Sequence, residues 1–107
     1  MPWVNAVPYV FGFFSVMENA PAQSGIYTIY NEESYIYIGE ADDIRAKLIN
    51  HLSGDYPCIM SRHPRSFSYE LCSSGQRFRR QAELIRELTP QCNIRLYLRS
   101  TAPLALG

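Results

Sequence analysis

The chain has 107 residues, of which 47% are hydrophobic, and its ten Lys and Arg residues balance ten Asp and Glu residues. This length allows one small domain with a modest core, and the absence of internal repeats and low-complexity tracts excludes repeat architectures. The charges are divided unevenly, because residues 1–44 hold six acids and no Lys or Arg, whereas residues 45–107 hold all ten bases and four acids. A basic half suits a polyanionic partner, and the competing interpretation is an ordinary solvated surface.

The three cysteines, Cys58, Cys72 and Cys92, are an odd number and lack C-x-x-C spacing. This pattern argues against a disulfide framework and against a zinc site. We therefore expect reduced thiols in a cytoplasmic protein.

Residues 1–23 form an aromatic N-terminal extension that begins with Trp3 and contains an apolar run over 7–16. Pro8 and Gly12 interrupt the run, which has no basic segment before it and is too short to span a bilayer. It predicts an added strand or extended segment packed on the domain, and no membrane partner. The alternative is an apolar surface for a protein partner or for a second copy, giving a homodimer.

Two short segments rich in β-branched and aromatic residues follow, Gly25-Ile26-Tyr27 and Tyr37-Ile38-Gly39. Nine residues separate them, and residues 31–34 in the middle are polar. Two such segments around a polar turn predict a β-hairpin.

A helix is predicted over 42–52, because Asp42 or Asp43 can cap its start and Gly54 can end it. Its apolar residues recur at positions i, i+4 and i+8, as expected for a buried stripe. They are Ile44, Leu48 and Leu52.

Residues 53–65 contain Gly54, Pro57 and Pro64 and predict a loop. The alternation of apolar and polar residues over 67–72 predicts a half-buried strand. Residues 76–88 then predict a second helix, which Ser73 or Ser74 can cap and Pro90 stops. Its inward stripe is expected to consist of Phe78, Gln81 or Ala82, Ile85 and Leu88. Residues 94–98 predict a further strand, and residues 100–107 a frayed tail.

The two tripeptides on adjacent strands, followed by a helix, resemble the signature of the GIY-YIG nuclease superfamily. The order β-β-α-β-α over about residues 24–93 is similar to the core of that superfamily. The resemblance implies an α+β, GIY-YIG nuclease-like fold with a small antiparallel or mixed sheet flanked by helices. The expected division is an extension over 1–23, the domain over 24–99 and a tail over 100–107.

The resemblance also implies that Tyr27 and Tyr37 face one site. Their gap is one residue shorter than is usual in the family, and side chains alternate between the two faces of a strand. We therefore expect a bulge, or a loop of three or five residues, that places Ile29 opposite Tyr37 and Tyr30 opposite Ile36. One face then carries Tyr27, Ile29, Tyr35 and Tyr37, and the other carries Ile26, Thr28, Tyr30, Ile36 and Ile38.

Enzymes of the family hydrolyse phosphodiesters with one divalent metal. For this chain the resemblance implies Mg²⁺ or Mn²⁺ if it is active, and otherwise no cofactor. A tyrosine of the family helps to activate water, and Tyr27 and Tyr37 match the two tyrosines of the family's signature. The family's arginine lies eight residues after the glycine of the second tripeptide, a position that Lys47 occupies, and His51 matches a histidine four residues later. Lysine keeps the positive charge but lacks the planar fork that grips two phosphate oxygens.

The metal-binding glutamate of the family lies nine residues before a proline and twelve before an asparagine. Counting back from Pro90 and Asn93 places it at Gln81, with Glu83 expected to face outward. A glutamine offers a carbonyl oxygen but no charge, so Gln81 is a weak candidate for a metal ligand. Structural roles are expected for Gly25, Gly39 and Asn93.

Six arginines are candidates for contacts to nucleic-acid phosphates, and the alternative for each is a solvated surface charge. They are Arg45, Arg62, Arg65, Arg77, Arg79 and Arg80.

Two functions compete at this point. One is a metal-dependent endonuclease with a weakened site formed by Tyr27, Tyr37, Lys47 and His51, acting on nucleic acid, with DNA the first expectation. The other is a catalytically inactive module that binds nucleic acid or protein on the same scaffold. A third hypothesis is a structural protein that dimerises through its aromatic N-terminus.

Overall fold

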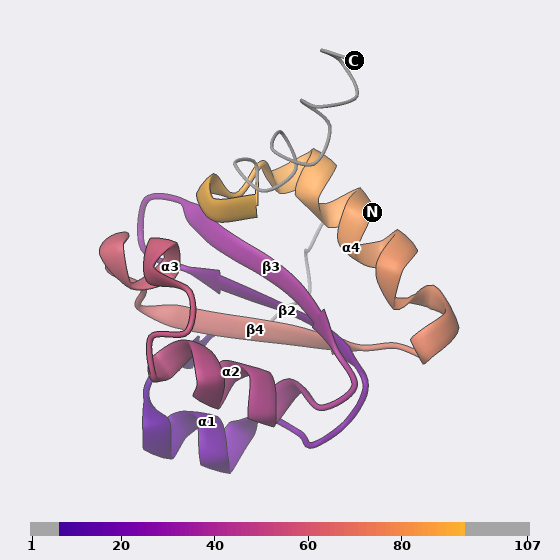
Figure 1. Cartoon of the computed structure of the whole chain (residues 1–107), viewed down its shortest axis with the longest axis horizontal. Coiled ribbons are helices and arrows are strands. Elements are labelled where there is room, and N and C mark those ends of the chain that lie inside the picture. Colours follow the sequence, from indigo (N-terminus) through magenta and orange to yellow (C-terminus); the bar gives the residue numbers. More distant parts are fainter. Residues whose placement is uncertain (1–6, 94–107) are drawn as a thin grey trace.

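A four-stranded antiparallel sheet with strand order β1-β4-β2-β3 lies between helices on its two faces in the computed structural model, which describes residues 7–93 (Figure 1). The strands are β1 Tyr9–Val10, β2 Gly25–Tyr30, β3 Tyr35–Ala41 and β4 Ser66–Leu71. The helices are α1 Phe13–Asn19, α2 Ile44–Leu52, α3 Pro57–Ser61 and α4 Ser74–Leu88. The predicted α+β class is confirmed, as are the hairpin, the helix after it and the order β-β-α-β-α, with α3 as an addition.

Each face of the sheet has its own apolar core. Tyr27, Ile29 and Phe67 point into the larger core, which α1 and α2 cover with Val16, Ile44 and Leu48. The smaller core lies under α4 and consists of Ile26, Ile38 and Leu84. Strand β2 is central and covered on both faces, which is why its residues from 25 to 29 are all buried.

The hairpin contains a bulge, as predicted, but its last pair differs from the prediction. Ile29 pairs with Tyr37, as expected, and the register shifts between Ile29 and Tyr30. Tyr30 then pairs with Tyr35, so the predicted pairing of Tyr30 with Ile36 is wrong. Ile36 is the extra residue of the bulge.

The turn explains this difference. The side-chain oxygen of Asn31 accepts hydrogen bonds from the backbone N–H groups of Glu33 and Ser34, both at 2.9 Å. Such an Asx turn stabilises a four-residue connection over 31–34. The bulge restores the register beyond the turn, so Tyr27 and Tyr37 still share a core.

The bulge also changes the surroundings of two side chains. The ring of Tyr35 lies 5.5 Å from that of Tyr30, with which it was predicted not to share a face. Ile36 is buried in the larger core together with Tyr27, although it was predicted on the opposite face. Both errors have one cause, because an inserted residue inverts the alternation on its side of the bulge.

The N-terminal segment is part strand and part helix. Tyr9 pairs with Phe67 of β4, which agrees with the predicted added strand. Residues 13–19 are helical rather than extended, so that part of the prediction is wrong. The helix forms because it buries Val16 against the sheet while Phe13 and Phe14 stay exposed. The division at residue 24 stays a prediction, and Trp3 lies outside the described residues.

Two further helical details differ from the sequence prediction. Residues 57–61 of the predicted loop form α3, with Pro57 in its first turn, where its missing N–H is not needed. In α4, Phe78 is 78% exposed rather than inward. Arg77 and Gln81 occupy the inward positions near it, because both find hydrogen-bond partners on the sheet.

Two predictions concern the C-terminal end of the chain. The strand over 94–98 and the tail over 100–107 lie outside the described residues, so neither is tested. None of the helices in the described part of the chain has the length and apolar character needed to cross a bilayer.

Cys58 and Cys92 form a disulfide, with their Cα atoms 5.9 Å apart, and Cys72 is free. The prediction of reduced thiols is therefore wrong for this pair. The two cysteines are 34 residues apart, and only the fold brings α3 next to the segment after α4. The cytoplasmic location that was predicted from the cysteine pattern loses this support.

Replacement of Cys58 by Ala should lower the free energy of unfolding by about 3–4 kcal/mol, because a closed loop of this length restricts the unfolded chain. Urea denaturation with and without reductant measures the effect, and Cys72→Ala is the matched control. A thiol titration of the untreated, denatured protein should find one thiol. Three thiols there would contradict the disulfide.

Candidate functional site

A chain of hydrogen bonds joins a tyrosine, a histidine and an aspartate on the α2 side of the sheet. Tyr27 Oη of β2 lies 2.7 Å from Nε2 of His51, which is in the last turn of α2. His51 Nδ1 lies 2.8 Å from Oδ1 of Asp55. Gly54, with a φ of 90°, allows the reversal after α2 that brings Asp55 back to the helix.

The glycines of the two tripeptides are sterically required. Gly39 pairs with Tyr27 across the hairpin, and a side-chain carbon at Gly39 would overlap the Tyr27 hydroxyl and ring. A side-chain carbon at Gly25 would overlap the backbone oxygen of Glu70 and approach Ile44. The predicted structural roles of Gly25 and Gly39 therefore have a direct physical cause: each leaves room for a close contact.

Aromatic rings enclose the histidine. The ring centre of Tyr37 lies 6.2 Å from that of Tyr27 and 5.3 Å from that of His51. Tyr56 packs edge-on against Tyr37 at 5.6 Å, and its hydroxyl donates to the backbone oxygen of Cys92. As a result, His51 is only 5% exposed.

Burial dominates the acid–base properties of this cluster. It raises the pKa of Tyr27 well above its ordinary value, with smaller contributions from Tyr37, Asp55 and Glu40. Burial likewise raises the pKa of Tyr37. It lowers the pKa of His51, and the hydrogen bond to Asp55 offsets part of that effect. At neutral pH the tyrosines are therefore phenols and the imidazole is neutral.

Lys47 lies one turn before His51 on α2, with an exposed side chain. Its charge makes a small contribution to the lowered pKa of His51. Arg45 is half-buried and donates from Nε to the backbone oxygen of Ala20 at 2.8 Å. Of these two bases, Lys47 is thus the one that stands exposed on the helix that carries His51.

Gln81 reaches the open edge of the sheet rather than the aromatic cluster. Its side-chain nitrogen donates to the backbone oxygen of Ile38 at 3.1 Å. Asn93 donates to the same oxygen at 2.8 Å and accepts from the N–H of Ile38. Because β3 is an edge strand, these two amides satisfy backbone groups that no strand pairs. Glu83, as predicted, points elsewhere and pairs with Arg80 at 3.1 Å.

The residues present do not fit a tightly held divalent cation. In the part of the chain that the structure describes, no group of three or more His, Cys, Asp or Glu side chains could hold a metal ion. Gln81 is neutral, and its amide nitrogen is engaged with Ile38. Hard divalent ions depend on charged carboxylate oxygens, which this position lacks.

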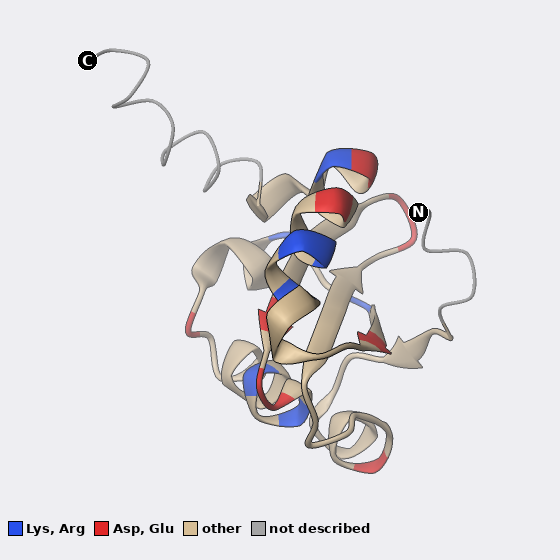
Figure 2. Cartoon of the chain, turned by 90° about the vertical axis from the view of Figure 1, so that its right-hand side faces the viewer, with Lys and Arg blue, Asp and Glu red and all other residues tan. Residues whose placement is uncertain are grey.

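Two of the candidate arginines make ion pairs within the domain. Arg77 contacts Glu40 at 2.8 Å and Asp42 at 2.7 Å. Arg80 contacts Glu70 at 2.8 Å as well as Glu83. The pairs with Glu40 and Glu70 hold α4 against the sheet, and Figure 2 shows acidic as well as basic residues along α4.

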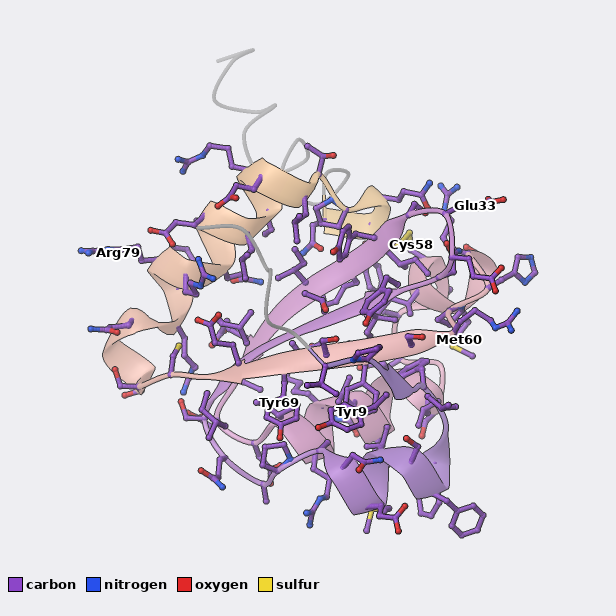
Figure 3. All side chains as sticks on the ribbon, turned by 180° about the vertical axis from the view of Figure 1, so that it is seen from behind. Tyr9, Glu33, Cys58, Met60, Tyr69 and Arg79 are labelled. Atoms are coloured by element: carbon purple, nitrogen blue, oxygen red, sulfur yellow. A yellow bond between two sulfur atoms is a disulfide. The ribbon has the colours of Figure 1, made fainter. Side chains whose placement is uncertain are left out.

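The remaining candidates are exposed. Arg62 and Arg65 follow α3, and the backbone N–H of Arg65 donates to Tyr30, which places them near the hairpin turn. Arg79 extends outward from α4 (Figure 3), on the opposite face of the sheet from His51.

Comparisons of the sequence with known proteins find relatives that match part of it. No profile of a protein family matches the chain. Excinuclease Cho from Salmonella typhi is 32% identical over 84 residues, covering 75% of this chain and 28% of the relative. The UvrABC system protein C of Hydrogenobaculum sp. is 42% identical over 38 residues, covering 36% of this chain and 7% of the relative. The chain thus spans less than a third of the length of these curated relatives.

The solved structures that resemble this fold are of the N-terminal GIY-YIG endonuclease domain of UvrC from Thermotoga maritima. The form bound to its catalytic magnesium ion has a TM-score of 0.64 at 21% identity, covering 74% of this chain and 92% of that domain. A point mutant of the same domain, also bound to its catalytic divalent cation, has a TM-score of 0.63 at 22% identity and covers 74% of this chain and 91% of that domain. This chain has the fold of a GIY-YIG domain.

Sequence reasoning missed two residues of the aromatic cluster around His51. Asp55 lies four residues after His51, a spacing that places side chains together on a helix, but Gly54 indicated that the helix had already ended. Tyr56 has no local signal, because its contacts to Tyr37 and Cys92 connect distant segments.

Replacement of Gly39 by Ala should destabilise the domain by about 2 kcal/mol or more, because the added methyl group must displace the Tyr27 ring from its buried place. Thermal unfolding measures the loss. Gly75→Ala is the control, since nothing lies near that position, and it should be neutral or stabilising by about 0.4–1 kcal/mol. Equal effects of the two substitutions would contradict the packing of Tyr27 on Gly39.

Proposed function

We propose that this GIY-YIG domain acts on nucleic acid, with DNA as the first substrate class, as a nuclease domain with a weakened site. The observation that carries the proposal is that only one half of the site is assembled. Tyr27, His51 and Asp55 form a continuous path for a proton. The position of the metal-binding carboxylate holds Gln81, whose amide is engaged with the backbone. The proposal predicts binding of DNA and slow cleavage.

The proposed roles follow from the contacts. Tyr27 positions the attacking water and passes on its proton, and Tyr37 encloses the same space. His51 accepts the proton. Lys47 supplies a positive charge for the phosphate, without the two-point grip of an arginine. Among the candidate arginines, Arg62 and Arg65 are proposed as DNA contacts.

A divalent ion, Mg²⁺ or Mn²⁺, is proposed as the cofactor of any cleavage, by analogy with the magnesium of the Thermotoga domain. When bound, such an ion supplies positive charge to the phosphodiester. The residues described here hold it poorly, so cleavage should require a high concentration of the ion. The cytoplasmic location and a domain over residues 24–99 stay predictions of the same proposal.

The second candidate function is a module that binds nucleic acid or protein without cleaving. The neutral Gln81 favours it, as does the exposed apolar side of the N-terminal segment, with Phe14 84% and Val10 68% exposed. A protein partner or a second copy of the chain on that side is part of this alternative. It differs from the main proposal in one measurable respect, the absence of cleavage.

Binding to DNA should weaken steeply with salt, with the logarithm of affinity falling by about 0.9 per contacted phosphate for each unit of log salt. Replacement of Lys47 by Ala should reduce that slope by about one. Fluorescence anisotropy with a labelled duplex measures both. Arg86→Ala, on the exposed side of α4, is the control and should leave the slope unchanged. Affinity that is undetectable even at low salt would remove the nucleic-acid function.

The double substitution Lys47→Arg and Gln81→Glu should create or raise Mg²⁺- or Mn²⁺-dependent nicking of supercoiled plasmid. The glutamate supplies charge for the metal, and the arginine supplies a bidentate phosphate contact. Neither single change should suffice, because groups that act as a unit are not additive.

Two comparisons test whether Lys47 and Gln81 are the positions that weaken the site. Gln81→Glu alone should lower the melting temperature without metal, since an unpaired carboxylate then lies beside the Ile38 carbonyl, and Mn²⁺ should restore it. If the unmodified chain cuts plasmid as fast as the double variant, Lys47 and Gln81 are not weakened positions. If neither protein cuts, the non-cleaving alternative holds.

A further inference from the structure

We propose that Asp55 is a positioning residue of this site: it fixes His51 in the tautomer that takes the proton of Tyr27. The inference deepens the proposed function and rests on it for the reaction, but not for the geometry. The residue belongs to neither tripeptide and to none of the positions assigned by resemblance. It is placed by the reversal at Gly54.

The geometry restricts the histidine strongly. Both ring nitrogens of His51 are within hydrogen-bond distance of a partner, at 2.7 Å from Tyr27 Oη and 2.8 Å from Asp55 Oδ1. An ionised carboxylate can only accept, so Nδ1 must carry the proton that it donates to Asp55. In the neutral ring, Nε2 is then the acceptor, and the Tyr27 hydroxyl donates to it.

The burial of His51 helps to preserve this direction of its two hydrogen bonds. His51 is 5% exposed, so water has little access with which to exchange its tautomers. The carboxyl side chain of Asp55 is 44% exposed, so its contact with His51 removes only part of it from water. A half-exposed carboxylate therefore orients a buried imidazole, which in turn orients a buried phenol.

The arrangement transfers a proton without forming a free phenolate. As a water molecule attacks phosphorus, its proton passes to Tyr27 Oη, and the phenol proton passes to His51 Nε2. The new O–P bond forms, the bond to the leaving oxygen breaks, and that oxygen takes a proton from solvent. The imidazolium that results carries protons on both nitrogens, and the Asp55 carboxylate stabilises it. The raised pKa of Tyr27 opposes any route in which the phenol ionises on its own.

The charged and titratable groups around His51 act in opposite directions. Tyr27 of β2 and Tyr37 of β3 bury it, which lowers its pKa, and Lys47 on the preceding turn of α2 lowers it slightly further. Asp55 is the group that raises it. Removal of the carboxylate charge should therefore make His51 a weaker base as well as a less ordered one.

The test is long-range ¹H–¹⁵N correlation spectroscopy of the histidine rings in the full chain. The sequence holds two histidines, so His63, which is exposed, is an internal reference. In the unmodified protein His51 should be in the Nδ1–H tautomer. In Asp55→Asn, whose amide can donate to Nδ1, the Nε2–H tautomer should become a major form. The pKa of His51 should also fall by about half a unit or more.

Two variants complete the measurement. Asp55→Glu keeps a carboxylate and should retain the Nδ1–H tautomer as the main form, whereas Glu18→Gln on α1 should change nothing. If Asp55→Asn leaves both the tautomer and the pKa of His51 unchanged, the proposal is overturned. Because Asp55 is at the surface, circular dichroism should show each variant folded.

A second readout separates this inference from the proposed function. In the Lys47→Arg and Gln81→Glu background, Asp55→Asn should lower kcat about tenfold or more with KM unchanged, since the residue does not touch DNA. If that background cleaves nothing, the result counts against the nuclease function, and the tautomer measurement still decides the role of Asp55. Unchanged kcat in an active background overturns the positioning role.

Discussion

The close contact between Tyr27 and Gly39 is the constraint on which the rest of the site depends. The phenol ring occupies the space that any side chain at Gly39 would need, so the ring is held over β3 with its hydroxyl directed at α2. That direction brings Oη to His51 and makes the last turn of α2 part of the site. The glycine of the second tripeptide and the tyrosine of the first are therefore one structural unit, which explains why the two tripeptides have to lie on paired strands.

The open edge of β3 shows why the glutamine at position 81 suits this chain. Its amide donates a hydrogen bond to the Ile38 oxygen, which a glutamate carboxylate cannot do. Asn93 donates to the same oxygen and accepts from the Ile38 N–H, and the disulfide of the neighbouring Cys92 fixes this segment to α3. A carboxylate at position 81 would remove this hydrogen bond from the edge strand, so the fold has a structural reason to hold an amide there.

Local patterns predicted most of the fold, and contacts between distant segments account for what they missed. The hairpin, α2 and α4 follow from apolar periodicity, caps and turn residues within each segment. The Cys58–Cys92 disulfide, α1 and the inward phase of Arg77 depend on partners far along the chain. The site divides in the same way: Tyr27, Tyr37 and His51 were predicted by resemblance and meet in the structure, whereas Asp55 needed the turn at Gly54, which no periodicity describes. The roles of these residues stay predictions.

Ion pairs within the domain explain part of the uneven distribution of charge along the sequence, and contact with a polyanionic partner is the other explanation. Arg77 of the basic half pairs with Glu40 and Asp42 of the acidic half, so part of the asymmetry is used to hold α4 on the sheet. The bases left exposed on the α2 side and near the hairpin turn are few, chiefly Lys47, Arg62 and Arg65. Affinity for a phosphate backbone scales with the number of such contacts, so DNA binding by this domain alone should be modest. A single strong determinant would then matter more than the total charge, and Lys47, one turn from the buried histidine, is the base placed to be that determinant.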